Sequence, residues 1–239
     1  MSSRIGVITN AFQEEKLIEG CIKQFQGTGF KHVVLIPLES WNGGYELGPD
    51  QTGFIASNLG AYIFYGRWQS ASDQLNFGLK ELKDCDWVII CDADERYKKI
   101  DLINMVDYLE TVQHDVVKTS DWEVYWKDSD HVLLPHQTDY PTIAVRPHVR
   151  FQNIRDTGLP FSFIPVTMYH FSYMRSDEEM LKKISTFDAA KQFQVQKWYN
   201  DIWLKWTPEM THLHPVNPRQ FERALWNPAP KEIKELLPI

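Results

Sequence analysis

The first half of the chain alternates compact apolar runs with amphipathic segments. In two of these segments, Glu14–Gln26 and Ser70–Lys83, apolar residues recur at the spacing of a helix. Strands that alternate with helices are joined by right-handed crossovers and form a parallel sheet with helices on its faces. The pattern therefore predicts an α/β fold whose strands are the apolar runs Arg4–Asn10, His32–Pro37, Ala61–Tyr65 and Trp87–Cys91.

The second half of the chain has a different pattern. After a helix that begins near Asp101, short strand-like pieces are interleaved with Asp, Pro and His, which is typical of mixed or antiparallel sheet with long loops. Ser176 and Glu179 form a capping box that predicts the start of a helix, and a last helix is expected after Asn217. The strand-like pieces are Val116–Thr119, Glu123–Trp126, Val132–Leu134, Thr142–Val145 and Thr167–His170.

Composition excludes several classes of protein. The chain has 239 residues, 43% of them hydrophobic, which is enough apolar surface for a folded domain. Its formal net charge of −7 argues against a broad basic face, so we expect no bulk binding of nucleic acid. The 3 cysteines show no zinc or disulfide spacing, and no signal peptide or transmembrane segment is apparent. We therefore expect a cytoplasmic protein.

The strongest chemical signal is the run Asp92-Ala93-Asp94-Glu95 at the end of the fourth predicted strand. Alternate residues of an extended chain point the same way, so Asp92 and Asp94 can face one site. Ligands of parallel sheets collect at the carboxyl ends of the strands. Two carboxylates there suit Mg²⁺ or Mn²⁺ and, through the metal, a diphosphate. The alternative is a pair of solvated loop acids.

Two stretches together resemble nucleotide-sugar glycosyltransferases of the GT-A fold, family 2. The first is the order of a strand, Asn10 with Glu14, a second strand and then Trp87–Glu95 (WVIICDADE). The second, His170–Ile184 (HFSYMRSDEEMLKKI), is similar to a pattern downstream of the Asp-x-Asp motif in many such enzymes. The resemblance implies a Rossmann-like, mainly parallel sheet flanked by helices, with a helical C-terminal extension. In this one continuous domain, residues 1–110 would bind the donor and residues 111–239 the acceptor.

The resemblance also implies roles for individual residues. Asp94 would bind Mn²⁺ or Mg²⁺ directly, Asp92 would share the metal or touch the donor ribose, and His170 would complete the metal shell. A hydrogen-bonded core histidine is the alternative for His170. The donor would be a nucleotide sugar, with a UDP-sugar favoured, bound by Thr9, Asn10, Glu39, Arg67, Gln74, Asn76 and Asp92.

The implied reaction is transfer of a sugar, with inversion, to a hydroxyl of a carbohydrate or glycoconjugate. Such a reaction needs a base that takes the acceptor proton. Asp156 fits by its place in the chain, with Glu95 and Glu123 as further candidates, although Asp156-Thr157-Gly158 is also a common turn signal. The 9 Trp residues are expected mostly in the core, with one or two available to stack on an acceptor sugar.

The Asp-x-Asp motif also occurs in other classes of protein, which are alternatives to a glycosyltransferase. A phosphatase of the haloacid dehalogenase class carries the motif after its first strand and has Thr or Val where this chain has Arg96, so we reject it. A sugar-nucleotide nucleotidyltransferase would share the sheet and the metal, but it needs a glycine-rich phosphate loop, and Thr9–Gln13 contains no glycine. A non-catalytic sugar-binding protein that retains the fold is the non-enzymatic alternative.

Overall fold

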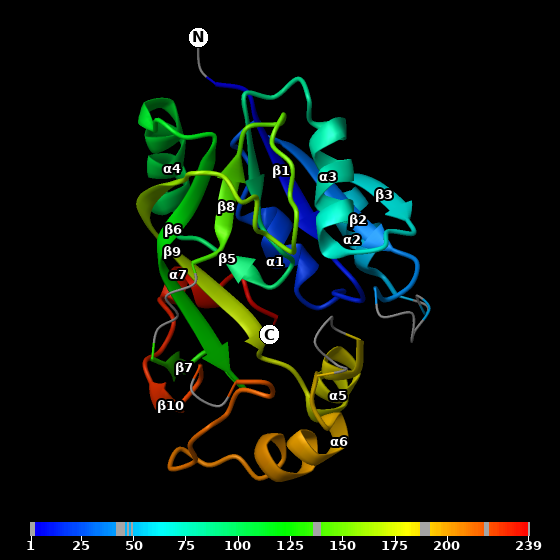
Figure 1. Ribbon diagram of the computed structural model, residues 1–239, viewed down its shortest axis with the longest axis vertical. Helices are drawn as coiled ribbons and strands as arrows, with labels where there is room; N and C mark the ends of the chain where they lie inside the picture. The colour runs from blue at the N-terminus through cyan, green and yellow to red at the C-terminus, as the bar shows by residue number, and fades with distance from the viewer. Residues whose placement is uncertain are drawn as a thin grey trace.

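A mixed sheet runs through the molecule, and the computed structural model describes residues 3–41, 46, 48, 50–135, 140–186, 192–217 and 220–238 of it. The strand order is β10-β7-β6-β8-β4-β1-β2-β3, and β9 pairs with β6 and β5 (Figure 1). The strands are β1 (Ile5–Asn10), β2 (Lys31–Pro37), β3 (Tyr62–Gly66), β4 (Trp87–Ile90), β5 (Glu95–Arg96), β6 (Val116–Trp126), β7 (His131–Leu134), β8 (Thr142–Val145), β9 (Ser162–Tyr173) and β10 (Arg223–Trp226).

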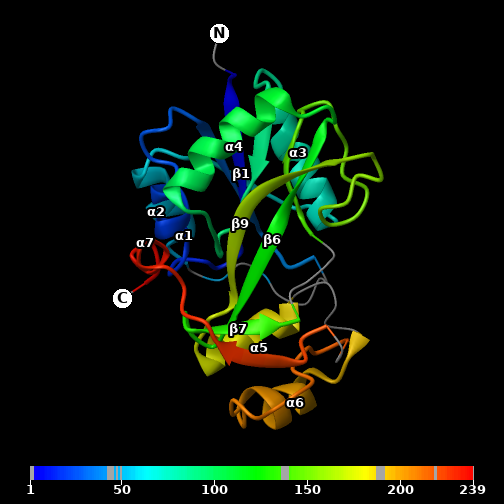
Figure 2. The ribbon, with the colours of Figure 1, turned by 90° about the vertical axis from the view of Figure 1, so that its left-hand side faces the viewer.

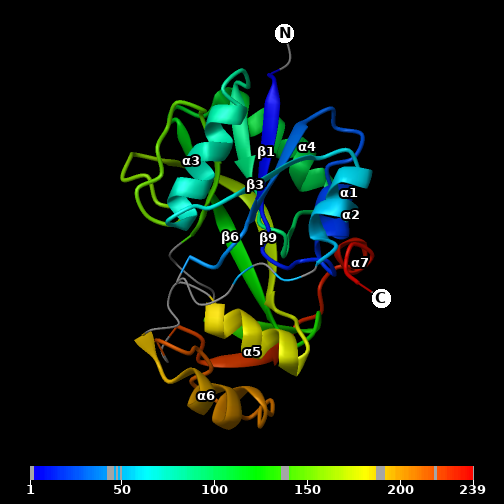
Figure 3. The same ribbon diagram turned by 90° about the vertical axis from the view of Figure 1, so that its right-hand side faces the viewer.

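The four strands expected in the first half are confirmed as a parallel unit in the order β3-β2-β1-β4. In β1, β2 and β4 the apolar side chains are buried on both faces of the sheet. The edge strand β3 is less covered, since Tyr62 and Tyr65 are more than half exposed. Leu75, Leu79 and Leu82 on or just after α3 (Ala71–Glu81) cover one face. The other face packs against α1 (Ile18–Lys23), α2 (Thr52–Asn58) and α4 (Lys99–Thr111) (Figure 3).

Of the two helices expected in the first half, one agrees with its sequence pattern and the other is shorter than expected. Ser70 caps α3, because its hydroxyl accepts from the backbone N–H of Asp73 at 3.1 Å. The helix expected over Glu14–Gln26 is regular only in α1, with turns on both sides. The middle of α1 lies against the C-terminal segment, since a Cβ on Gly20 would stand 1.7 Å from the carbonyl oxygen of Leu236.

The long strands β6 and β9 extend beyond the parallel unit and carry a second layer of structure (Figure 2). The two strand-like pieces between Val116 and Trp126 are one strand, and β9 begins before the expected Thr167. Residues Arg223–Trp226 form β10, which pairs antiparallel with β7, so the expected helix after Asn217 is wrong for these residues. The C-terminal part is therefore mixed rather than wholly helical.

Most of the tryptophan excess fills a second core at the far end of β6. Trp126 is fully buried there, and its ring centroid lies 5.2 Å from that of Trp203 and 6.1 Å from that of Trp198. This core is closed by α5 (Asp177–Thr186), α6 (Val195–Trp198) and the π-helical turn η2 (Tyr199–Trp203). Core packing thus explains these side chains, whereas Trp226 is 68% exposed.

The capping box positions α5 at the start of this second layer. Glu179 accepts from the backbone N–H of Ser176 at 2.9 Å, and the Ser176 hydroxyl accepts from the Glu179 backbone N–H at 3.3 Å. The helix begins four residues after β9 ends and therefore lies close to the carboxyl ends of the parallel strands. Among the described helices, none has the length and apolar character that crossing a bilayer requires.

Candidate active site

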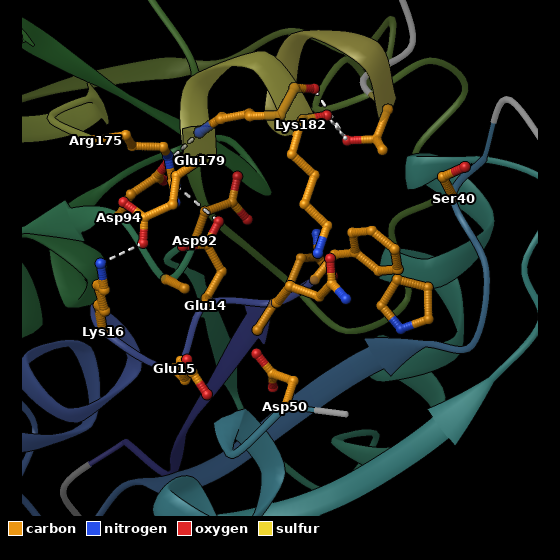
Figure 4. A pocket seen from close by; sticks show the side chains of 18 of the residues that line it. Glu14, Glu15, Lys16, Ser40, Asp50, Asp92, Asp94, Arg175, Glu179 and Lys182 are labelled. Carbon is orange, nitrogen blue, oxygen red and sulfur yellow. Dashed lines mark hydrogen bonds and ion pairs between the residues drawn. The ribbon is translucent and has the colours of Figure 1, made fainter. Parts of the chain in front are cut away.

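A pocket of about 330 Å³ lies where the loops after β1, β2 and β4 face α5 (Figure 4). Asn10 ends β1 and residues 11–16 follow it, Ser40 and Trp41 follow β2, and residues 92–94 follow β4. The opposite wall carries Arg175 and side chains of α5. The pocket thus occupies the edge of the parallel sheet at which α/β folds bind their ligands.

Buried polar atoms without a partner gather in this pocket. In the described part of the chain, twelve buried side-chain nitrogen or oxygen atoms have no hydrogen-bond partner. Folded proteins pair nearly all such atoms, so a concentration of unpaired ones indicates a place where a ligand or water supplies the partner. Half of the twelve belong to pocket residues: Asn10 Oδ1, Gln13 Oε1, Glu14 Oε2, Trp41 Nε1, Gln74 Oε1 and Asp92 Oδ1.

Asp94 lies in a cluster of nitrogen donors. Its Oδ2 is 2.7 Å from Lys183 Nζ and 3.2 Å from Arg175 Nη2, and its Oδ1 is 3.3 Å from His170 Nε2. Burial by itself would raise the pKa of Asp94, but Lys183, His170 and Arg175 together hold this pKa well below its usual value. Asp94 is therefore charged at neutral pH, and both of its oxygens already have partners.

Asp92 pairs with Arg155, a residue that no sequence motif marks as part of the site. Arg155 Nη2 lies 3.0 Å from Asp92 Oδ2 and 2.8 Å from Glu95 Oε2. Burial raises the pKa of Asp92 to about 6, although Arg155 opposes the rise. The other oxygen, Asp92 Oδ1, is the unpaired atom that belongs to the pocket.

Glu95, expected as a possible base, is turned away from the pocket. Its side chain is 2% exposed, and it accepts both from Arg155 and from the backbone N–H of Asp92 at 2.9 Å. It does not belong to the pocket lining. In this structure Glu95 holds Arg155 and the loop after β4 in place instead of facing a substrate.

The environment of His170 sets the position of its ring proton. Trp122 Nε1 donates to His170 Nδ1 at 3.3 Å. An indole N–H can only donate, so Nδ1 is the acceptor, and the proton of the neutral ring lies on Nε2, which faces Asp94. A histidine that binds a metal through Nε2 needs a lone pair on that atom and usually donates from its other nitrogen. The contact with Trp122 therefore opposes metal binding by His170.

The predicted metal ligands do not form a metal site in this arrangement. Asp94 and His170 lie together, but Asp94 already contacts three N–H donors and Asp92 pairs with Arg155. Over the described residues, no three His, Cys, Asp or Glu side chains are grouped so that they could hold a metal ion. Asp92, Asp94 and His170 thus do not fit a divalent cation here, since Asp94 would first have to release Lys183 and Arg175.

Of the residues expected to bind the donor, Asn10, Gln74 and Asp92 line the pocket. Thr9 does not: its hydroxyl is buried 2.8 Å from Nε2 of His32, whose pKa burial lowers to about 3. Asn76 is also elsewhere, because its side chain exchanges two 2.9 Å hydrogen bonds with the backbone of Phe151. Both side chains hold the scaffold together.

Three further expectations fall outside the pocket lining. Glu39 pairs with Arg67 at 2.5 Å, and the two side chains are partly exposed. Asp156 is exposed and accepts from the backbone N–H of Gly158 at 3.1 Å, which is the contact of a turn residue and not of a base in the pocket. The expected base is therefore absent from the pocket, whereas its neighbour Arg155 reaches the Asp-x-Asp motif. The sequence gives no local signal for this, because the pairing joins residues 60 or more positions apart.

Neither a protein-family model nor a curated protein matches the sequence. Solved structures do resemble the fold. The mannosyltransferase PcManGT from Pyrobaculum calidifontis, in complex with GDP-Man and Mn²⁺, matches 78% of this chain and 62% of its own length, with 14% identity and a TM-score of 0.50. TarS 1–349 of S. aureus matches 77% of this chain and 66% of its own length, with 15% identity and a TM-score of 0.48.

The expected fold class is therefore confirmed: the chain has a mixed α/β fold like that of GT-A glycosyltransferases. It spans about two thirds of the length of each of these two solved structures. At such low identity the likeness extends to the fold and not to individual site residues.

Proposed function

We propose that the pocket binds a nucleotide sugar and that the protein transfers its sugar to a hydroxyl group of a carbohydrate or glycoconjugate. The observation that carries the proposal is the set of unpaired buried atoms at the carboxyl edge of the parallel sheet. Five of these six atoms are acceptors, so a ligand rich in O–H and N–H donors would satisfy them. A nucleoside joined to a sugar has this character, and GDP-Man is bound in PcManGT, whose fold is similar.

Individual side chains have distinct parts in this proposal. The unpaired oxygens of Asn10, Gln74 and Asp92 accept from hydroxyl and N–H groups of the donor. Asp94 holds Lys183 and Arg175 beside the pocket, where their N–H groups can donate to a departing diphosphate. The proton of the acceptor needs a carboxylate in the pocket, and Glu14, which has one unpaired oxygen there, is the candidate base.

A divalent cation is the part of the sequence prediction that these residues do not support. PcManGT is described with Mn²⁺, and the resemblance implies Mn²⁺ or Mg²⁺ here. Because Lys183 and Arg175 contact Asp94 and the ring proton of His170 faces it, no step of the proposed reaction passes through a metal. The assay below is therefore run with and without Mn²⁺.

The test is release of nucleoside diphosphate from UDP-, GDP- and dTDP-sugars in the presence of simple sugar acceptors. We expect the wild type to turn over at least one donor and Asp94→Ala to lower the rate about 100-fold. Asp107→Ala, an exposed change on α4, is the matched control and should leave the rate unchanged. If the wild type releases no diphosphate from any donor and calorimetry detects no nucleotide binding, the proposal is overturned.

A further inference from the structure

The pocket lining contains four basic side chains, and one of them has no acidic partner. Lys182 is exposed, extends from α5 into the pocket and forms no ion pair with any residue in the described part of the chain (Figure 4). The other three are neutralised by neighbouring acids: Lys16 by Glu179 at 2.6 Å, Arg175 by Glu14 at 2.8 Å and Lys183 by Asp94 at 2.7 Å.

The acids of the lining are not evenly placed around Lys182. Glu15 and Asp50 lie across the pocket from α5 (Figure 4) and accept from the backbone N–H groups of Gln51 and Thr52. Asp92 shares the charge of Arg155 behind it. The α5 side of the pocket therefore carries a positive charge that no acid offsets, whereas the rest of the pocket presents unpaired acceptors.

We propose that Lys182 binds the diphosphate of the donor directly, in the place that the sequence resemblance gives to a divalent cation. This inference rests on the proposed function. A phosphate oxygen cannot donate to the unpaired acceptors of the pocket, so the diphosphate belongs at the α5 end and the sugar hydroxyls at the other. A lysine ammonium is a mobile point charge with three donors, which suits a diphosphate.

The same contact serves the transfer step. The C–O bond between sugar and diphosphate breaks and leaves its electron pair on the diphosphate, whose added negative charge lies beside Lys182. The acceptor oxygen forms the new bond to the sugar carbon and gives its proton to a carboxylate. Lys182 therefore stabilises the leaving group and takes no proton from the acceptor.

Calorimetry in EDTA tests the inference with UDP, GDP and dTDP and with the corresponding nucleosides. We expect Lys182→Gln to weaken binding of the preferred diphosphate about tenfold and to leave nucleoside binding within about twofold. Lys182→Arg should retain most of the affinity, since the charge is kept. Lys80→Gln, on the exposed side of α3 and outside the pocket, is the control and should bind as the wild type does.

The outcomes separate this inference from the proposed function. Diphosphate binding that is unchanged in Lys182→Gln, or that occurs only after Mn²⁺ is added, overturns the role of Lys182 and leaves nucleotide-sugar binding intact. Absence of binding of every nucleotide and nucleoside to the wild type, with and without Mn²⁺, overturns the proposed function itself. Unchanged nucleoside affinity in the variant shows that the pocket is folded.

Discussion

Arg155 is the cation on which the loop after β4 depends, and its replacement by Met should destabilise the fold measurably. The guanidinium lies 3.0 Å from Asp92 and 2.8 Å from Glu95, and its side chain is only 10% exposed. Met keeps an apolar stem of similar length but leaves the 2% exposed Glu95 without a cation. Breaking a buried pair in this way costs about 3–5 kcal/mol, and we expect about 3 kcal/mol at pH 7.5 because Asp92 is partly solvated.

The loss in Arg155→Met should shrink as the pH falls. Arg155 lowers the pKa of Asp92, so its removal lets this pKa rise further above its present value of about 6. Protonation then neutralises a carboxylate that has lost its partner, and the penalty for burying its charge disappears. At pH 5.5 we expect the loss of stability to be smaller than at pH 7.5 by about 1 kcal/mol.

Urea unfolding followed by tryptophan fluorescence at both pH values measures these differences, provided that the m-value is unchanged. Arg223→Met is the control, because the Arg223 side chain is 49% exposed and its removal should change the free energy of unfolding by less than about 0.5 kcal/mol. A loss below about 1 kcal/mol for Arg155→Met at pH 7.5, or one that does not shrink at pH 5.5, would show that Arg155 does not stabilise the fold by pairing with Asp92 and Glu95.

Two further changes test the structure around the pocket. Asp92→Asn should raise the free energy of unfolding by about 1 kcal/mol at pH 7.5, because a carboxyl with a pKa of about 6 destabilises the fold when it is charged. This value is reduced to allow for solvent screening of the partly exposed side chain. The gain in stability should fade as the pH falls from 6 to 4, and urea unfolding across that range detects it. Gly20→Ala should cost about 2 kcal/mol, because its Cβ would stand 1.7 Å from the Leu236 carbonyl oxygen. Thermal unfolding of Gly20→Ala at the wild-type temperature would contradict the close packing of α1 against the C-terminal segment.

The first half of the fold could be predicted because its signals are local. Each strand of the parallel unit is an apolar run, and Ser70 stands where α3 begins. The helix α2 is not predicted, because Thr52–Asn58 has too few apolar residues to show a helical period. In the second half, β6 and β9 pair along their whole length across about 45 residues of sequence, with irregularities in register that no local pattern reveals.

The candidate site divides in the same way. The place of Asp92 and Asp94 could be predicted, because they follow a buried strand of the parallel sheet and ligands bind at that edge. Both residues do line the pocket. The partners of these acids could not be predicted, because Arg155, Arg175 and Lys183 reach them from segments 60 to 90 residues away. Whether a carboxylate binds a metal or an arginine depends on such distant neighbours, so the sequence alone favoured a metal where the structure places cationic side chains.

We propose that the pocket beside α5 binds a nucleotide sugar, and a crystal structure after separate soaks with UDP- and GDP-sugars would locate the donor. We expect donor hydroxyl or N–H groups within hydrogen-bond distance of the unpaired oxygens of Asn10, Gln74 and Asp92, with the diphosphate at Lys182. A nucleotide bound elsewhere on the molecule, or no bound nucleotide with water on these oxygens, would contradict it.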